Sequence, residues 1–302
     1  MSPKESTEVR VEVDGRTLRL SNLDKVLYPR TGTTKGEVLN YYAQVSPAML
    51  PLLANRCATR VRWPNGVEKQ SFFEKNIPGG TPSWVRTAEV PTTGSRALAS
   101  GRARNGDVLV FPVVDDLATL TWLANLAALE LHVHQWTVTK AGKVQGANRI
   151  VIDLDPGEGA GLHECCQVAL LVRERLAERN LETEAVTSGS KGLHLYAALQ
   201  RRKDPDDSTA LAKEVAEDLA KEHSRLVTAT MTKSKRSGKV FLDWSQNAGS
   251  KTTLSPYSLR GRELPTVATP VTWDEVEAGA GDPLGLEQFR FEEVLDRLAD
   301  RR

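Results

Sequence analysis

Cysteine and long apolar runs are both scarce in this chain of 302 residues. Cys57 stands alone and Cys165 and Cys166 are adjacent, a spacing that suits neither a zinc site nor a disulfide framework. No run of eighteen apolar residues occurs, so the sequence predicts no transmembrane helix and no membrane partner. The N-terminal stretch MSPKESTEVRVEVDG lacks the apolar segment of a signal peptide. We therefore expect a cytoplasmic protein with reduced thiols.

An excess of one charge is missing as well, because the formal net charge is only +1. Basic residues gather locally instead. The stretch from Lys233 to Lys251 carries five of them against one acid, and Arg56, Arg60 and Arg62 form a second group. Local clusters on a neutral protein suit specific phosphate contacts better than a general attraction to polyanions, although a solvated basic loop has the same composition.

Turn signals and hydrophobic periodicity predict an α/β protein with a mixed (α+β) sheet. Residues 9–22 read as a hairpin around Asp14-Gly15, and Thr34 with Glu37 forms a capping box that opens a helix. Two further strands flank a Pro-Asn-Gly turn within 57–75. The remaining expected strands are 107–114, 131–138, 149–155, 184–188, 192–198 and 239–244, and the remaining expected helices are 116–129, 162–179 and 207–223.

The segment Arg149–Gly157 (RIVIDLDPG) combines a buried strand pattern with two acids. Side chains alternate along a strand, so Asp153 and Asp155 share one face, with α-carbons roughly 7 Å apart. The Pro-Gly pair ends the strand and leaves the acids at its C-terminal edge, where ligands of α/β sheets bind. Neighbouring carboxylates repel unless a cation such as Mg²⁺ or Mn²⁺ neutralises them. An exposed strand end would carry such a pair too, but the apolar run Ile150–Ile152 favours acids that emerge from the core.

A third acid, Asp243, lies in the strand-like segment Lys239–Ser245 (KVFLDWS). Val240, Leu242 and Trp244 share the other face of that strand. Three carboxylates at strand ends would supply a two-metal site for in-line phosphoryl or nucleotidyl transfer. Considered alone, Asp243 fits equally well as a turn residue bonded to the backbone.

The segment Thr187–Leu195 (TSGSKGLHL) has the composition of a phosphate cradle. Its small residues let backbone amides approach an anion, Ser188 and Ser190 offer hydroxyls, and Lys191 brings a positive charge. It lacks the spacing of a Walker A loop, and Ser-Gly loops are often only turns. His194 would meet a triphosphate bound there, but a lone strand histidine is more often a core residue.

Two histidines share a strand face in Leu131–Trp136 (LHVHQW). No further His or Cys pattern completes a zinc site. We interpret His132 as a contact to a nucleotide or phosphate and assign no role to His134.

Near the N-terminus, Asn22, Lys25 and Lys35 flank a Tyr-Pro-Arg-Thr-Gly stretch. Two lysines close to a helix N-terminus would hold a terminal phosphate, although ordinary surface lysines also explain them. The adjacent rings of Phe72 and Phe73 cannot both face the core from one strand, so one of them is available to stack on a base. Core packing is the alternative.

These segments occur in the order found in the archaeo-eukaryotic primase superfamily, and the chain resembles the polymerase domain of bacterial ligase D and its stand-alone relatives. The matching stretches are LSNLDKVLYPRTGTTK (20–35), TRVRWPNGVEKQSFFEK (59–75), LELHVHQW (129–136), RIVIDLDPGEG (149–159), TSGSKGLHLY (187–196), and MTKSKRSGKVFLDWSQN with SPYSLRGR (within 231–262). The resemblance implies one primase-polymerase domain over 1–302, in which 1–56 packs on a catalytic core of about 57–262 and 263–302 forms a helical tail.

The resemblance also implies roles for individual residues. The metal-binding catalytic acids would be Asp153, Asp155 and Asp243, served by two Mn²⁺ or Mg²⁺ ions. Contacts to the incoming ribo- or deoxyribonucleotide would come from His132, Ser188, Lys191, His194, Arg260, Lys233 and Arg236. Asn22, Lys25 and Lys35 would bind the 5′-phosphate at a DNA gap or broken end, and Phe72 and Phe73 would pack against the template. Expected partners are such DNA, the end-binding protein Ku and a separate DNA ligase, in the bacterial cytoplasm at the nucleoid.

Two departures limit what the resemblance carries over. No stretch resembles the phosphoesterase and ligase domains and no Lys-x-Asp-Gly adenylation motif occurs, so we expect no ligation activity from this sequence. The start at Met1 and the charged end DRLADRR favour a stand-alone protein over an excised domain. Two alternative functions remain, a metal-dependent phosphoesterase or nuclease and a non-catalytic DNA-end-binding module. The first would need more histidine ligands or a water-activating base, and the second has no need of three acids.

Overall fold

The N-terminal hairpin forms as the Asp-Gly signal predicts. The computed structural model describes residues 8–91 and 108–300, so residue 107, the expected start of one strand, lies outside it. β1 (Glu8–Val13) pairs with β2 (Arg16–Ser21), and Asp14 and Gly15 both have positive φ angles, of 50° and 69°. Positive φ at both central residues is the geometry that the right-handed twist of a two-residue hairpin requires.

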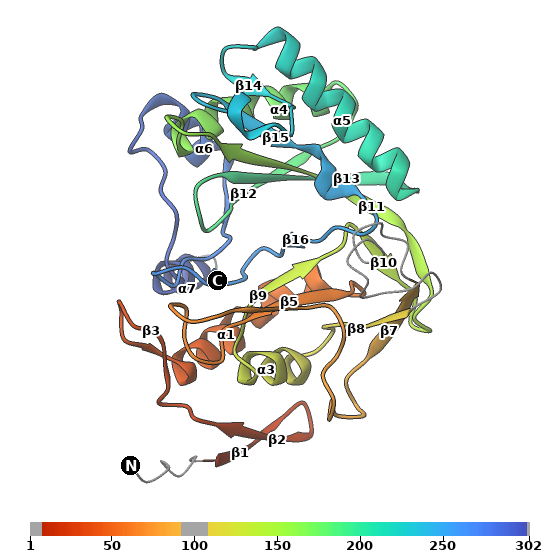
Figure 1. Ribbon diagram of the computed structural model, residues 1–302, viewed down its shortest axis with the longest axis vertical. Coiled ribbons are helices and arrows are strands. Elements are labelled where there is room, and N and C mark those ends of the chain that lie inside the picture. Colours follow the sequence, from red (N-terminus) through yellow and green to blue (C-terminus); the bar gives the residue numbers. More distant parts are fainter. Residues whose placement is uncertain (1–7, 92–107, 301–302) are drawn as a thin grey trace.

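The lower lobe in Figure 1 is built around α1 (Lys35–Leu53), which begins with the predicted capping box between Thr34 and Glu37. α1 and α3 (Leu117–Asn125) cover a sheet of four strands in the order β16-β9-β5-β6. The strand bounds are β5 (Ala58–Arg62), β6 (Phe72–Glu74), β9 (Ala128–Val133) and β16 (Thr253–Leu254). Two small hairpins flank this lobe, namely β3 (Val26–Tyr28) with β4 (Thr33–Thr34) and β7 (Thr87–Pro91) with β8 (Val108–Pro112).

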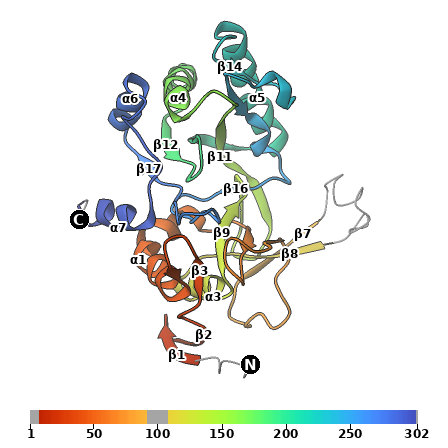
Figure 2. The same ribbon diagram turned by 60° about the vertical axis from the view of Figure 1, so that its left-hand side comes forward.

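The upper lobe contains a seven-stranded sheet in the order β14-β15-β11-β13-β12-β17, with β10 also paired to β11. Its strands are β10 (Trp136–Val138), β11 (Val144–Pro156), β12 (Thr183–Thr187), β13 (Leu193–Lys203), β14 (Val227–Thr228), β15 (Val240–Asp243) and β17 (Pro270–Val271). One face packs against α4 (Leu162–Ala177), α5 (Pro205–Glu222) and α6 (Trp273–Gly281) in a core that includes Ile150, Ile152 and Leu154. Figure 2 shows these helices on the outer side of the upper lobe.

The strand order reflects two split β-α-β units. β11 and β12 run parallel to each other with α4 as the crossover, but β13 lies between them and is antiparallel to both. The direct parallel pair among the described strands is β14 with β15. The rule that ligands bind at the C-terminal edge of parallel strands therefore does not explain the position of the acids, although their strand and its end are as predicted.

Two predicted elements between residues 116 and 138 have the wrong bounds. The helix expected over 116–129 begins after its N-cap Asp116 but ends at Asn125, and Ala127 has a φ of 57°. β9 starts at Ala128 because this apolar stretch pairs with β5, and the strand expected over 131–138 is divided into β9 and β10. A short apolar segment fits either a buried helix or a buried strand, and tertiary pairing decides between them here.

The C-terminal part links both lobes. After α6, the chain returns so that α7 (Phe291–Ala299) packs against α1, where the rings of Tyr41 and Phe291 meet edge to face at 5.7 Å. Figure 1 shows β16 running between the two lobes. Within the described residues, no helix combines the length and apolar character needed to cross a bilayer.

Candidate active site

Asp153 and Asp155 lie on the wall of a cavity of about 830 Å³. The alternation of β11 places them opposite Ile152 and Leu154, which are fully buried against the helices, so the acids project from the inner face of the sheet. Asp153 is largely enclosed, with 14% of its side chain exposed, whereas Asp155 is exposed. The two acids that the sequence paired therefore face one cavity.

The third acid, Asp243, comes next to them through strand pairing. Its α-carbon is the register partner of Asp153 in the antiparallel pair of β11 and β15. Asp243 also caps the short helix η2 (Trp244–Asn247), where its carboxylate accepts hydrogen bonds from Ser245 N at 3.0 Å and from Gln246 Nε2 at 2.9 Å. Both sequence interpretations of Asp243, a strand-end acid and a backbone-bonded turn residue, thus describe it correctly.

The electrostatics of this cluster are unfavourable without a bound cation. Burial and the charges of Asp155 and Asp243 raise the pKa of Asp153 well above its ordinary value. Desolvation and the charge of Asp243 likewise raise the pKa of Asp155, against the opposing charges of Arg236 and Arg260. A carboxylate cluster held in this way is stabilised by a divalent cation.

The donor chemistry fits Mg²⁺ or Mn²⁺, which favour carboxylate oxygens. No group of three or more His, Cys, Asp or Glu side chains among residues 8–91 and 108–300 is already arranged to hold a metal ion. The carboxylate of Asp243 is engaged with η2, whereas Asp153 and Asp155 line the cavity directly.

The loop between β12 and β13 forms another part of the wall through Ser188, Gly189, Ser190 and Lys191. The Ser188 hydroxyl accepts hydrogen bonds from Ser190 N at 3.2 Å and Gly192 N at 3.1 Å, so it organises the loop as well as lining the cavity. Gly189 has a φ of 67°, and a Cβ there would lie 2.7 Å from Arg260 Cγ. Because Gly189 has no Cβ, the loop backbone can approach Arg260 this closely.

His194 lies beside Asp153 at the cavity wall, with its Nε2 3.5 Å from Asp153 Oδ1. The ring is buried and its Nδ1 has no hydrogen-bond partner among the described residues. Burial, followed by the charges of Arg260 and His132, lowers the pKa of His194 to about 3. His194 is therefore a neutral imidazole in this arrangement, and it lies on the cavity wall as well as against the core.

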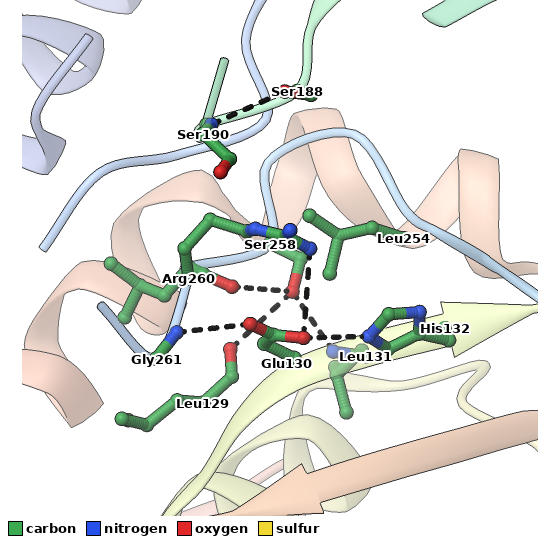
Figure 3. Close-up of polar contacts among 12 residues, drawn as sticks. Leu129, Glu130, Leu131, His132, Ser188, Ser190, Leu254, Ser258, Arg260 and Gly261 are labelled. Carbon is green, nitrogen blue, oxygen red and sulfur yellow. Dashed lines mark hydrogen bonds and ion pairs between the residues drawn. The ribbon is translucent and has the colours of Figure 1, made fainter. Parts of the chain in front are cut away.

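Glu130 holds two of the predicted nucleotide contacts in place, and it is the main residue that the sequence analysis missed. Figure 3 shows its carboxylate between the His132 ring, Gly261 N and the Arg260 guanidinium, at 2.8, 3.0 and 3.6 Å. Burial alone would raise the pKa of Glu130, but the His132 hydrogen bond and the Arg260 charge outweigh it and lower the pKa. Glu130 lies on the same strand face as His132, two residues before it, which is the signal that sequence reasoning could have used.

Other residues that sequence reasoning missed also line the cavity. They are Arg30, Pro156, Gln246, Thr252, Thr253, Leu254, Arg262, Glu263, Leu264 and Thr266. Most come from the segment after η2, which supplies cations and hydroxyl groups. This segment has no hydrophobic periodicity, so sequence reasoning did not single it out.

His134 is a core residue. It lies in the lower lobe between the rings of Phe111, at 5.3 Å, and Trp136, stacked at 4.1 Å. Burial lowers its pKa to about 3, and its Nδ1 contacts Cys57 O at 3.2 Å. It has no place in the cavity wall.

The basic residues of the η1 region (Lys233–Lys235) lie beside the cavity and are not among the residues that line it. Arg236 stacks over the Phe241 ring at 3.6 Å and donates to Met231 O at 2.8 Å. Its charge acts on Asp155, whereas Lys233 is exposed to solvent.

The other basic group, from Arg56 to Arg62, is not a free surface patch. Arg60 is fully buried, and both Arg60 and Arg62 form ion pairs of 2.8 Å with Glu74. Arg56 is buried elsewhere and donates to backbone carbonyls.

Asn22, Lys25 and Lys35 meet at the entrance to α1, as predicted. The backbone N–H of Lys35 donates to Lys25 O at 2.8 Å, and Asn22 turns the chain with a φ of 54°. Lys35 Nζ donates to Ser21 O at 2.6 Å, and Lys25 Nζ donates to Asn65 Oδ1 at 2.9 Å. Burial and the charge of Lys25 lower the pKa of Lys35 to about 8. Both ammonium groups therefore lie near the N-terminus of α1, and their hydrogen-bond acceptors are neutral.

Phe72 and Phe73 on β6 are both exposed, by 43% and 60%. They pair with Arg62 and Val61 of β5 at the edge of the lower sheet. Core packing is therefore excluded for both rings, and each presents aromatic surface to solvent.

Comparison with known proteins shows the family and the fold of this chain. A family model described as the LigD primase-polymerase domain matches residues 34–302. This chain belongs to the LigD primase-polymerase domain family. Members of this family are metal-dependent nucleotidyltransferases. Membership confirms the family, the mixed fold and the polymerase class that the sequence predicted.

Several LigD proteins are similar to this chain. The multifunctional non-homologous end joining protein LigD of Mycolicibacterium smegmatis is 49% identical over 281 residues, which are 93% of this chain and 34% of that protein. The bifunctional LigD of Bacillus subtilis is 32% identical over 282 residues, 93% of this chain and 42% of that protein. The chain thus spans between about a third and two fifths of the length of these LigD proteins.

A solved LigD polymerase domain has the same fold. The polymerase domain from Mycobacterium tuberculosis ligase D in complex with DNA is 47% identical and matches with a TM-score of 0.85, covering 94% of each chain.

Proposed function

We propose that this chain is a template-dependent primase-polymerase that adds ribo- or deoxyribonucleotides to DNA ends and across short gaps during break repair. The observation that carries the proposal is the cavity in which Asp153 and Asp155 face Lys191, Arg260 and the Ser188 loop. Nucleotidyl transfer requires acids that bind a divalent cation. It also requires cationic and hydroxyl groups that bind a polyphosphate. This cavity has both.

The acids would hold two divalent ions, Mn²⁺ or Mg²⁺. Such ions stabilise the attacking and leaving oxygens of an in-line displacement when they are bound. Asp153 and Asp155 would bind them from β11, and Asp243 from the paired strand, with Ser245 and Gln246 orienting its carboxylate. His194, neutral and beside Asp153, adds no positive charge to compete with the cations.

The incoming nucleotide would bind with its triphosphate along the cationic part of the wall. Lys191 and Arg260 supply charge, Ser188 organises the amides of its loop, and His132 projects from β9. Arg260 is suited to this role because its planar guanidinium matches phosphate oxygens and is steadied by Glu130. Lys233 and Arg236 would contact the nucleotide or primer end from the neighbouring η1 region.

The DNA would be held by two further features. Lys25 and Lys35, with Asn22, would bind the 5′-phosphate beyond the gap, because they are adjacent cations with neutral acceptors at a helix start. Phe72 and Phe73 would stack on or pack against template bases, which their exposure at a sheet edge allows.

The cellular setting is proposed by analogy with the relatives. Their names place LigD proteins in non-homologous end joining, and the solved neighbour is a polymerase domain in complex with DNA. We infer by analogy a single domain over 1–302, working at DNA breaks in the bacterial cytoplasm at the nucleoid, together with Ku and a separate ligase.

Primer extension on a one-nucleotide gap with a 5′-phosphate tests this function. We expect the primer to be extended with the nucleotide complementary to the template, in the presence of Mn²⁺ or Mg²⁺ and not after chelation. In Mn²⁺, ribonucleotides should be incorporated faster than deoxyribonucleotides. Shortening of the primer would indicate a phosphoesterase or nuclease, and DNA binding without any change in primer length would indicate a non-catalytic end-binding module.

A further inference from the structure

A second cavity, of about 470 Å³, lies where the end of α1 meets β10 and the start of β11. Four cations line it, and the described residues on its wall include no acid. The cations are Arg56, Lys140, Arg149 and Arg202. The other polar residues of its wall are neutral amides and hydroxyls such as Asn55, Asn148 and Thr137. A cavity with this composition carries positive charge that its own wall does not neutralise.

Two of these arginines, Arg56 and Arg149, are buried, with 6% and 9% of their surface exposed. Arg56 donates from Nη1 to the carbonyls of His134 and Gln135 at 3.0 and 2.9 Å, and from Nη2 to Asn148 Oδ1 at 2.8 Å. These partners are neutral, so they satisfy hydrogen bonds without balancing the charge. Burial and the nearby charges of Arg149 and Arg202, with Tyr196 opposing, lower the pKa of Arg56 to about 8.

Arg149 is less satisfied still. Its Nε donates to Gln135 Oε1 at 2.7 Å and its guanidinium lies over the Tyr196 ring at 4.6 Å, but its buried Nη2 has no hydrogen-bond partner among the described residues. Glu184 is the acid whose charge acts on Arg149, and it is not among the lining residues. A buried cation without a carboxylate or a full set of acceptors is costly unless a ligand supplies them.

The other two cations, Lys140 and Arg202, are exposed. Arg202 is oriented by hydrogen bonds from its Nη1 to Thr137 Oγ1 at 2.7 Å and to Gly146 O at 3.0 Å. Exposed cations of this kind attract an anion, and buried guanidiniums then bind it in a less hydrated environment.

We propose that this second cavity binds a phosphate group, either as a free phosphate or as part of a DNA backbone. Guanidinium groups present several N–H donors in a planar fork that matches phosphate oxygens, and three of the four cations are arginines. The volume is in the range that holds a small ligand or part of a larger one.

The second cavity is distinct from the cavity that contains the acids. Arg149 and Asp153 are on the same face of β11 but four residues apart, a separation of roughly 14 Å along a strand. No lining residue is shared between the two cavities. The proposal therefore does not depend on the nucleotidyl transfer proposed above and is tested without nucleotide or divalent ions.

The test uses a rim variant, Lys140→Ala/Arg202→Gln, which leaves the buried pair Arg56 and Arg149 in place. The matched control is Lys143→Ala/Arg201→Gln, which removes two exposed cations of the same segments that do not line the cavity. Inorganic phosphate is titrated calorimetrically into wild type, rim variant and control at constant ionic strength. The acid-containing cavity is unchanged in all three proteins, so a difference between them reports the second cavity. Urea denaturation confirms that each protein is folded.

We expect the rim variant to bind phosphate about fivefold more weakly than wild type, while the control matches wild type. A second variant, Arg149→Gln, keeps the rim and should lose the same binding if it folds. An equal loss in rim variant and control, or no loss in either with phosphate and with DNA, overturns the proposal.

A parallel titration with a short blunt duplex bearing 5′-hydroxyl ends identifies the source of the phosphate group. Weaker DNA binding by the rim variant alone, with or without a change in binding of free phosphate, assigns the cavity to a DNA backbone. A loss confined to inorganic phosphate assigns it to a free phosphate or a small phosphorylated ligand.

Discussion

At the scale of single residues, the acids of the site differ in what surrounds them. Asp153 and Asp155 face other acids and could be found from the sequence, because strand alternation and a buried apolar run are local signals. Glu130 faces Arg260 and Gly261, which are more than 125 residues away along the chain. Its role depends on a tertiary contact, and its sequence neighbourhood of leucines indicates only a strand.

Glu130→Gln tests the positioning of His132 and Arg260. The substitution keeps the shape of the side chain but removes the negative charge that orients the His132 ring and the Arg260 guanidinium. We expect KM for the incoming nucleotide to rise by about tenfold, the cost of a weakened charged hydrogen bond, with a smaller change in kcat. Steady-state extension kinetics measure both constants. An unchanged KM, or a protein that has lost stability in urea, would mean that Glu130 acts only on the fold.

If Lys35 binds the 5′-phosphate as proposed, we expect that binding to depend on pH. Burial and the charge of Lys25 lower its pKa to about 8, so it loses its charge as pH rises from 7 to 9, while a phosphomonoester stays doubly charged. Affinity for a 5′-phosphorylated gap should fall by about tenfold over this range, as measured by fluorescence anisotropy at constant salt. Unfolding does not explain such a fall, because a lysine with a lowered pKa costs stability at low pH and that cost disappears as pH rises.

Three controls accompany that titration. A gap with a 5′-hydroxyl should show little pH dependence, and Lys35→Arg should flatten the curve because arginine stays charged. Lys25→Ala/Lys35→Ala should bind the phosphorylated gap at least about tenfold more weakly at pH 7. If this variant loses affinity equally for both DNAs, the lysines are general backbone contacts, and if it loses none, they do not contact the DNA.

At the scale of elements, the order of helices and strands could be predicted in most of the chain, but the pairing could not. The helices over 162–179 and 207–223 and the strands around Asp153 and His194 were predicted because periodicity and turn residues are local. The insertion of β13 between β11 and β12 depends on which strand edges meet, and short strands such as β16 and β17 have no periodic pattern. The helix that ends early at Asn125 fails for the same reason.

A substitution at Gly192 tests how tightly the Ser188 loop packs against β11. A Cβ at this position would lie 1.9 Å from Leu154 O, in the backbone next to Asp153 and Asp155. Gly192→Ala should therefore lower the free energy of unfolding by about 1–3 kcal/mol, the range for overpacking a dense site. Urea denaturation measures it against Gly79→Ala, where a Cβ meets no atom within 4 Å. Equal stability of the two variants would show that the loop yields easily and does not fix the wall.

At the scale of the whole molecule, the site is made by two lobes. The acids come from the upper sheet, His132 and Glu130 from β9 of the lower sheet, and Arg260 from the segment that follows β16 between them (Figure 1). The sequence resemblance predicted the acids, His132 and Arg260 as members of one site, but it predicted neither Glu130 nor the division into two lobes. Each lobe has its own hydrophobic core beneath its part of the cavity wall.

The central claim is that the acids of β11 catalyse nucleotide addition, and single-turnover incorporation by Asp153→Ala and Asp155→Ala tests it most directly. The assay uses the complementary ribonucleotide on a one-nucleotide gap with saturating Mn²⁺, with Glu158→Gln, an exposed acid just after the strand, as the matched control. Both alanine variants should lose at least about 100-fold in rate, because metal stabilisation of the reacting oxygens contributes several kcal/mol. Their affinity for the gapped DNA should stay close to that of wild type, since phosphate contacts elsewhere remain. Incorporation by either variant above about a tenth of the wild-type rate, with the control at full rate, would contradict the assignment.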